Sequence, residues 1–202
     1  MEIKKYTVGQ LKTNSYLIIS DGVGAIIDPG NEEKMLCEEI EKSGAELKYI
    51  LLTHGHVDHI GACSYLSERF GAKIVCGENE KELLLDPKLN LSGSFGDEFF
   101  VSPHILLKEG DEIEIGSVSL KVLNTPGHTG GSIVYLGDGI MFSGDTLFKG
   151  CVGRTDLPTG DSNQLFDSLS KLKSLMGDYK IFPGHYDNTT LSYEIKFNPY
   201  LK

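Results

Sequence analysis

One short run constrains this chain more than any other. Residues 53–59 read Thr-His-Gly-His-Val-Asp-His, so four side chains able to bind a metal ion fall within six positions. The apolar run 49–52 that precedes it is typical of a buried strand. In residues 60–70, which follow, apolar side chains recur at helical spacing, and Gly71 suits the position just past a helix C-terminus. We therefore expect the metal-binding side chains where a strand ends and a helix begins.

The same run predicts two metal positions rather than one. In an extended segment, residues i and i+2 point in the same direction, so His54 and His56 can reach one ion together. Asp58 and His59 come after the chain has turned, and we expect them to face a second position. The competing interpretations are histidines on the surface and a single structural ion. The density of ligands between a strand and a helix favours two ions.

Short apolar runs bounded by turn residues indicate the strands. They are predicted over 16–19, 25–27, 49–52, 73–76, 113–123 as a hairpin, 133–135, 140–142 and 179–182, the last being the final strand.

Amphipathic segments predict helices over 32–43, 79–85 and, starting from residue 161 or 162, to about 176. Asn31 stands where an N-cap residue is expected for the first of these helices. The inward face of the third helix is predicted to consist of Leu165, Phe166, Leu169, Leu172 and Met176. Residues 88–103 are predicted to form a loop, anchored by Phe95, Phe99 and Phe100.

Composition excludes several classes of protein. The 202 residues, 40% hydrophobic and 24% charged, suit one globular domain whose core needs no disulfide bonds. A net charge of −10 argues against a nucleic-acid partner. No apolar run approaches the length of a membrane span, and the N-terminus lacks the apolar region of a signal peptide. The four cysteines form no C-x-x-C pair, so we expect reduced thiols in a cytoplasmic protein.

The run 53–59 resembles the signature of the metallo-β-lactamase superfamily. The later ligands of that signature follow in order, as His128 in the run 125–129, Asp145 in the run 143–146 and His185 in the run 183–185. The resemblance covers residues 13 to 201, nearly the whole chain. It implies an α+β fold, a four-layer αββα sandwich, which we expect as a single domain over residues 1–202.

The resemblance also implies how the ligands are divided between two divalent metal ions. His54, His56 and His128 would hold the first ion, and Asp58, His59 and His185 the second, with Asp145 bridging both. Imidazole and carboxylate ligands without cysteine suit zinc, our first choice, as well as iron or manganese. Two ions roughly 3.5–4 Å apart lower the pKa of bound water toward about 7, which provides a nucleophile. Asp58 and Asp145 are the candidate catalytic carboxylates.

Asp28, at the end of a predicted buried strand, has two interpretations. The matching residue of the superfamily lies beneath the metal site, whereas an Asp before Pro29-Gly30 also suits a simple turn. The residues alone are compatible with both roles.

The run 144–156 resembles glyoxalase II, the hydroxyacylglutathione hydrolases, and above all their short bacterial relatives. This implies a small-molecule thioester as substrate. A thiol leaving group has a pKa of about 8.5 and departs as thiolate without a separate acid. The chain ends before the C-terminal helical domain that contributes glutathione contacts in full-length glyoxalase II. In addition, Tyr186-Asp187 stand where a Gly-Pro pair is usual, so glutathione selectivity stays open.

Arg154 and Tyr186 are the candidate substrate-binding residues. Arg154 lies nine positions beyond Asp145, and the matching position of glyoxalase II is basic and near the glutathione moiety. A guanidinium can bind a carboxylate in bidentate fashion. The alternative for Arg154 is an ion pair within the chain, with Asp156 or Asp161.

Three other functions compete with thioester hydrolysis. A persulfide dioxygenase of the same fold would bind one Fe(II) through His54, His128 and Asp145. Another hydrolase of the superfamily would cleave a lactone or a phosphoester. A binding protein stabilised by metal, with no turnover, is the third alternative, and the complete ligand sets argue against it.

Overall fold

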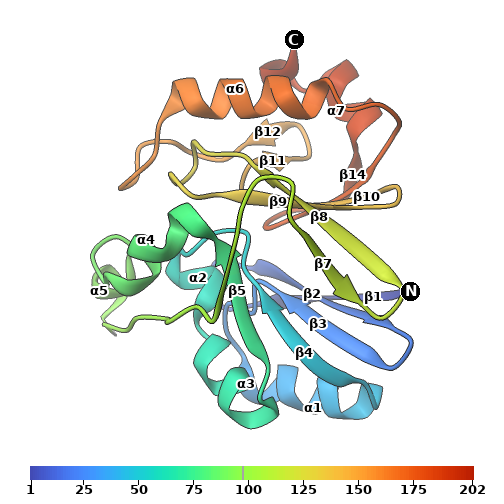
Figure 1. Cartoon of the computed structure of the whole chain (residues 1–202). Coiled ribbons are helices and arrows are strands. Elements are labelled where there is room, and N and C mark those ends of the chain that lie inside the picture. The colour runs from blue at the N-terminus through green and yellow to red at the C-terminus, as the bar shows by residue number, and fades with distance from the viewer. Residues whose placement is uncertain (97) are drawn as a thin grey trace.

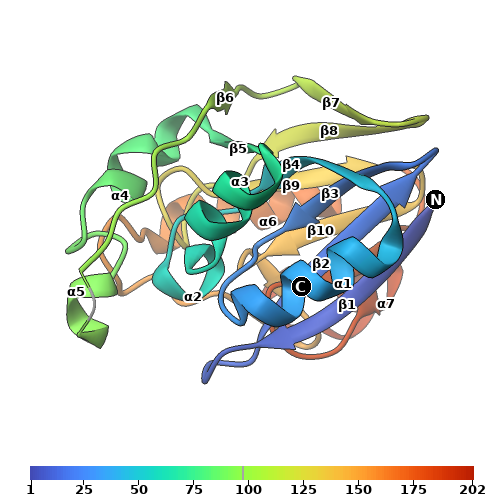
Figure 2. The same ribbon diagram turned by 90° about the horizontal axis from the view of Figure 1, so that it is seen from below.

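The computed structural model describes residues 1–96 and 98–202, and two six-stranded sheets packed face to face form its centre (Figure 1). Helices α1 and α3 cover the outer face of the first sheet, as Figure 2 shows, and α6 and α7 cover the outer face of the second. This is a four-layer αββα sandwich, so the predicted α+β class and architecture are confirmed. In the described ranges, no helix combines the length and apolar character that a membrane span requires.

The N-terminal half of the chain builds the first sheet, in the order β1-β2-β3-β4-β5-β6. The first three strands are antiparallel, and β3 to β6 run parallel to one another. The strands are β1 (Glu2–Val8), β2 (Thr13–Ser20), β3 (Val23–Ile27), β4 (Glu46–Leu51), β5 (Lys73–Gly77) and β6 (Ile105–Leu107). The helices between them are α1 (Glu33–Ser43), α2 (Val57–Ile60), α3 (Cys63–Phe70), the 3₁₀ helix η1 (Glu78–Glu80), α4 (Lys81–Leu85) and α5 (Ser92–Phe95).

The second sheet has the order β14-β13-β10-β9-β8-β7. Its strands β7 to β10 are antiparallel, whereas β13 lies parallel to β10. The strands are β7 (Glu112–Ile115), β8 (Val118–Asn124), β9 (Ile133–Gly137), β10 (Ile140–Gly144), β13 (Lys180–Pro183) and β14 (Thr189–Thr190), and a separate small ribbon pairs β11 (Leu147–Phe148) with β12 (Cys151–Val152). The remaining helices are α6 (Ser162–Lys173), α7 (Leu191–Phe197) and the 3₁₀ helix η2 (Pro199–Leu201).

The central strands read as continuous apolar runs because both of their faces are buried. In β2, Leu17 packs beneath α1 and α3, while Tyr16 and Ile18 pack between the two sheets. In β10, Met141 packs beneath α6, and Phe142 packs between the sheets. Three apolar layers therefore hold the sandwich together, and they fix the strand ends that carry the predicted ligands.

The predicted strands are confirmed, whereas several helix details are wrong. Asn31 is not the N-cap of α1, because Glu32 occupies that position with φ of 59° and the Asn31 side chain accepts from the next amide instead. The predicted inward face of α6 is wrong at two positions: Phe166 is 52% exposed, and Met176, beyond the end of the helix, is 91% exposed. The buried stripe consists of Leu165, Leu169 and Leu172, and Phe166 points about 100° away from Leu165 on the helix surface.

Two further predictions about segments are corrected. The helix expected after the metal-binding run is interrupted, because α2 ends at Ile60 and α3 begins at Cys63. Residues 179–182 do not form the final strand, since β14 follows β13. Of the predicted loop anchors in 88–103, Phe99 packs against the first core layer while Phe95 and Phe100 are 60% and 61% exposed; residue 97 of that loop lies outside the described ranges.

Candidate metal centre

The chain segments that follow four strands meet at one edge of the sandwich. His54 and His56 follow β4, and Asp58 and His59 lie on the first turn of α2. The other three predicted ligands, His128, Asp145 and His185, follow β8, β10 and β13. Because parallel and antiparallel strands of two different sheets end here, residues more than a hundred positions apart become neighbours. All seven predicted ligands are brought together.

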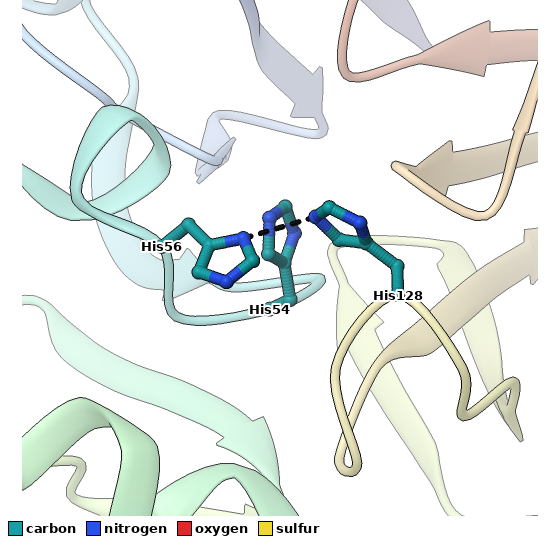
Figure 3. Close-up of side chains that lie close together, drawn as sticks. All are labelled: His54, His56 and His128. Atoms are coloured by element: carbon teal, nitrogen blue, oxygen red, sulfur yellow. Dashed lines mark hydrogen bonds between the residues drawn. The ribbon is translucent and has the colours of Figure 1, made fainter. Parts of the chain in front are cut away.

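The first group consists of His54, His56 and His128, one ring nitrogen of each lying within 4.8 Å of the others (Figure 3). Nδ1 of His56 is 2.9 Å from Nε2 of His128. Nδ1 of His128 donates to the backbone carbonyl of Arg154 at 2.8 Å, which leaves its Nε2 as a lone-pair ligand. All three imidazoles are buried, so they are held in place before any ion binds.

The second group consists of Asp58, His59 and His185. Oδ2 of Asp58 lies 3.3 Å from Nε2 of His185 and 3.5 Å from Nε2 of His59. Asp145 stands between the two groups, with Oδ1 3.4 Å from Nε2 of His59. Its Oδ2 lies 3.4 Å from Nε2 of His185 and 3.6 Å from Nε2 of His128. One carboxylate thus contacts ligands of both groups, which is the position that a bridging residue requires.

Unpartnered buried atoms indicate what belongs in this site. Within the described residues, the buried side-chain atoms without a hydrogen-bond partner are Nε2 of His54, His56 and His59 and Oδ1 of Asp145. Buried polar atoms nearly always have a partner, so a cluster of orphans calls for one. Imidazole nitrogens and carboxylate oxygens are ligands of divalent transition metals. The residues present therefore fit divalent metal ions.

The pKa values of the histidines differ between the two groups. Burial, together with the neighbouring histidines, lowers the pKa of His54 and lowers that of His56 to about 3, so both imidazoles are neutral. Burial would also lower the pKa of His59 and His185, but the nearby aspartates outweigh it and raise these values to about 9 and about 10. Without metal, the second group thus holds protons between carboxylates, and a cation would take their place.

Asp28 lies beneath the site, which decides between its two interpretations. Its Oδ2 accepts from Nδ1 of His59 at 3.0 Å and from the Thr53 hydroxyl at 2.6 Å, and its Oδ1 accepts from the Thr53 amide. A carboxylate bonded to Nδ1 fixes the tautomer in which Nε2 faces the metal position. Asp28 also has a positive φ of 48°, a conformation that costs free energy for a residue other than glycine.

Sequence reasoning missed two supporting residues at the start of β2. Thr13 is fully buried and its hydroxyl donates to Oδ2 of Asp58 at 2.8 Å. The Asn14 side-chain amide donates to the carbonyls of Pro183 and Tyr186, each at 2.9 Å, and so holds the turn that carries His185. The available signal was a run of three polar residues, 13–15, opening a strand whose middle is apolar.

The turn before His185 requires glycine for reasons of space. A Cβ atom on Gly184 would lie 2.2 Å from Oδ1 of Asp145 and 2.7 Å from Cε1 of His59. Both distances are far below van der Waals contact. The close approach of this turn brings the second-group residues around Asp145.

The two predicted substrate-binding residues are both at the surface. The Arg154 guanidinium forms a bidentate ion pair with Asp156, at 2.6 and 2.7 Å, which is the alternative weighed above. Only its backbone carbonyl contacts a predicted ligand, His128. Tyr186 is 65% exposed beside His185, and its ring packs edge-on against Phe148 with 5.4 Å between centroids.

Comparison with known proteins places the chain in a family. Residues 8–185 match the model of the metallo-beta-lactamase superfamily, so the chain belongs to that superfamily. It is 39% identical to "Probable metallo-hydrolase YqgX" of Bacillus subtilis, with 100% of this chain and 98% of the relative covered. It is 38% identical to "Hydroxyacylglutathione hydrolase GloC" of Haemophilus influenzae, again with 100% and 98% covered.

Solved structures agree with the fold. The B3 metallo-beta-lactamase BLEG-1 is 33% identical, with a TM-score of 0.93 over 99% of both chains. The protein TTHA1623, solved in a di-iron-bound form, is 34% identical, with a TM-score of 0.87 over 98% of this chain and 100% of that one. ETHE1 from Myxococcus xanthus is 29% identical, with a TM-score of 0.82 over 98% and 84%.

Proposed function

We propose that this protein is a metal-dependent thioesterase that hydrolyses hydroxyacylglutathione-type thioesters. The observation that carries the proposal is the pair of ligand groups joined by Asp145, which contacts His59 and His185 of one group and His128 of the other. The likeness to the hydroxyacylglutathione hydrolase GloC over the full chain supports the substrate class.

Two divalent ions, with zinc as the first expectation, would be held by the two groups. The ions would supply a water-derived nucleophile at neutral pH and would polarise the substrate carbonyl. The nitrogen and oxygen ligands are compatible with zinc, iron or manganese, and the di-iron form of TTHA1623 makes iron a specific competitor. The chain's own part is to orient the ligands: Asp28 and the Arg154 carbonyl fix the tautomers of His59 and His128, and Thr13 holds the Asp58 carboxylate.

Asp58 and Asp145 are the proposed catalytic carboxylates. Burial alone would raise the pKa of each, but His59 and the other neighbouring histidines hold both values below the usual range. Both groups are therefore ionised at neutral pH and able to accept a proton from the attacking water, as weak bases. Departure of the thiolate needs no acid, which suits a site that offers none.

Arg154 and Tyr186 are the proposed contacts for the thiol carrier. The Arg154 side chain is 62% exposed, and an exposed ion pair stabilises little, so a substrate carboxylate can replace Asp156 at low cost. Tyr186 presents an exposed ring next to His185, against which the apolar part of a thioester can pack.

A persulfide dioxygenase is the second candidate, and the likeness to ETHE1 favours it. It would use one Fe(II) at His54, His128 and Asp145. The likeness to BLEG-1 adds β-lactam hydrolysis as a third activity to assay.

One set of measurements separates these functions. The metal content of protein purified from metal-replete medium is determined alongside hydrolysis of a hydroxyacylglutathione, hydrolysis of a chromogenic β-lactam, and oxygen consumption with glutathione persulfide. We expect two equivalents of metal and thioester hydrolysis. One equivalent of iron with oxygen consumption, and no thioesterase activity, would replace the proposal with the dioxygenase.

A further inference from the structure

We propose that Glu80, which is none of the predicted ligands, is a positioning residue that holds the first group of histidines in register. Glu80 is the last residue of η1, directly before α4. This inference rests on the proposed function only in that the first group has to bind an ion.

A single carboxylate joins the two loops that carry the first group. Oε1 of Glu80 accepts from the backbone N–H of Gly55, the residue between His54 and His56, at 2.7 Å. The hydroxyl of Thr129, the residue after His128, lies 2.9 Å from Oε1 and 3.0 Å from Oε2. The loops are more than 70 residues apart in sequence, and Glu80 contacts both within one residue of each histidine.

Glu80 is tightly packed against the loop that carries His128. Glu80 is 1% exposed, and Thr129 is fully buried. A Cβ atom on Gly131 would lie 2.3 Å from the Glu80 nitrogen and 2.5 Å from its Oε2, so the loop backbone rests directly on this residue. The Thr129 hydroxyl also lies 2.7 Å from the Ser132 hydroxyl, which closes the loop upon itself. A shift of His128 would therefore break several contacts at once.

The charge of Glu80 points to the same role. Among the described residues, hydrogen bonds from Gly55, Thr129 and Gly131 surround this buried carboxylate, and no salt bridge to a cation accompanies them. Burial of an unpaired carboxylate is unfavourable, and burial raises the pKa of Glu80 to about 7. The first group consists of three imidazoles and carries no carboxylate of its own. A cation bound there would offset the cost of ionising Glu80.

The chain contains a matched control. Glu194 in α7 is also fully buried, and it accepts from the Gly150 backbone N–H at 2.8 Å and from the Thr189 hydroxyl at 2.5 Å. The chemistry is the same, a buried carboxylate between a glycine amide and a threonine hydroxyl. Glu194, however, holds the turn between β11 and β12, which carries no predicted ligand.

The test is a Co²⁺ titration of chelator-treated full-length protein, followed by absorbance. His56→Ala removes a ligand of the first group and His185→Ala a ligand of the second. The binding step that each variant loses identifies the first-group step and the second-group step of the wild type. Glu80→Ala is expected to weaken the first-group step about 10- to 100-fold and to leave the second-group step unchanged. Glu80→Gln should restore part of the affinity, because its amide oxygen still accepts from the Gly55 N–H.

A second pair of variants covers the case in which Glu80→Ala does not fold. Thr129→Val removes only the hydroxyl that binds Glu80 and should weaken the first step, whereas Thr129→Ser keeps the hydroxyl and should not. Glu194→Ala should leave the relative affinity of the two steps unchanged.

Three results would overturn the inference. Unchanged first-step affinity in folded Glu80→Ala or Thr129→Val would remove the positioning role. An equal loss of Co²⁺ affinity in both steps would show that Glu80 supports the fold as a whole and not the first group in particular. A wild type that binds no Co²⁺ would refute the proposed function, and this inference with it, whereas loss of thioesterase activity alone would leave the metal-affinity result standing.

Discussion

Asp28 and His59 form a buried hydrogen bond of 3.0 Å beneath the metal centre, and this bond directs Nε2 of His59 toward Asp58 and Asp145. Asp28 comes from the end of β3 and His59 from α2, so the bond joins a strand terminus to the helix that begins the site. The same carboxylate accepts two bonds from Thr53, immediately before His54. One residue outside the ligand set therefore orients both groups.

Asp28→Asn should reduce the affinity for the second-group ion about 10- to 100-fold, because an amide fixes the His59 tautomer less well than a carboxylate does. Competition with a chromophoric chelator measures this affinity. Glu41→Gln, on the exposed side of α1, is the control and should leave this affinity unchanged. Full retention of second-group affinity would show that Asp28 only shapes the turn.

Asp145→Ala should abolish thioester hydrolysis while the chain still folds. The change removes the carboxylate that lies between the two groups and leaves two like-charged ions facing each other. Metal stabilises the folded state by mass action, so the difference in Tm between metal-loaded and chelated protein should shrink in the variant. Wild-type kcat in this variant would disprove the bridging assignment.

Gly184→Ala should weaken metal binding, since the new methyl group would lie 2.2 Å from Oδ1 of Asp145. Metal content by elemental analysis is the readout, with an expected loss of at least one equivalent. Gly24→Ala in β3 is the control, because its Cβ would meet Ala45 at an ordinary 3.5 Å. Two equivalents of metal in Gly184→Ala would mean that the turn moves freely.

The Glu80 carboxyl should give the metal-free protein a pH-dependent stability. Its pKa is raised by burial from 4.5 to about 7 in the folded state, although the Gly55 amide and the Thr129 hydroxyl counteract part of that rise. Between these values the folded state binds more protons than the unfolded state, so this contribution is full below pH 4.5 and is lost as pH rises toward 7. The negative charge of Glu80 in turn helps burial to raise the pKa of the neighbouring Cys76 thiol, whereas Lys81 lowers it.

Urea denaturation with chelator present, for wild type and Glu80→Gln, measures this contribution from pH 4.5 to 8. The free energy of unfolding of the wild type should fall relative to that of the variant as pH rises toward 7 and should then level off. A difference that stays constant across this range would show that Glu80 does not titrate there.

Arg154→Ala should raise KM for a glutathione thioester several-fold, because a charged hydrogen bond to a substrate carboxylate would be lost. The effect should be smaller for an uncharged thioester that lacks the carboxylates. Asp156→Ala, which frees the guanidinium, should lower KM for the same glutathione thioester. An equal loss of kcat/KM on charged and uncharged substrates would assign Arg154 a structural role, through the carbonyl that binds His128.

The sequence by itself determined the candidate ligands and their strand-end positions. His54, His56, Asp58 and His59 are adjacent in the chain, and each later ligand follows an apolar run that reads as a buried strand. Local spacing sets which side chains point the same way, and hydrophobic periodicity identifies strands whose two faces are both buried. These signals are short-range, and the resemblance to the superfamily selected the later ligands, so the candidate site could be predicted without the fold.

Only the tertiary structure decided how the ligands are held. The Asp28–His59 bond, the Thr13–Asp58 bond and the two contacts of Glu80 each join segments 25 or more residues apart, and no local pattern encodes them. The same applies to Phe166 and Met176, whose apolar character suggested an inward face that the packing of α6 does not provide. Contacts between distant segments depend on how whole sheets pack, because a side chain's partners are fixed only when its strand or helix takes its place in the layers.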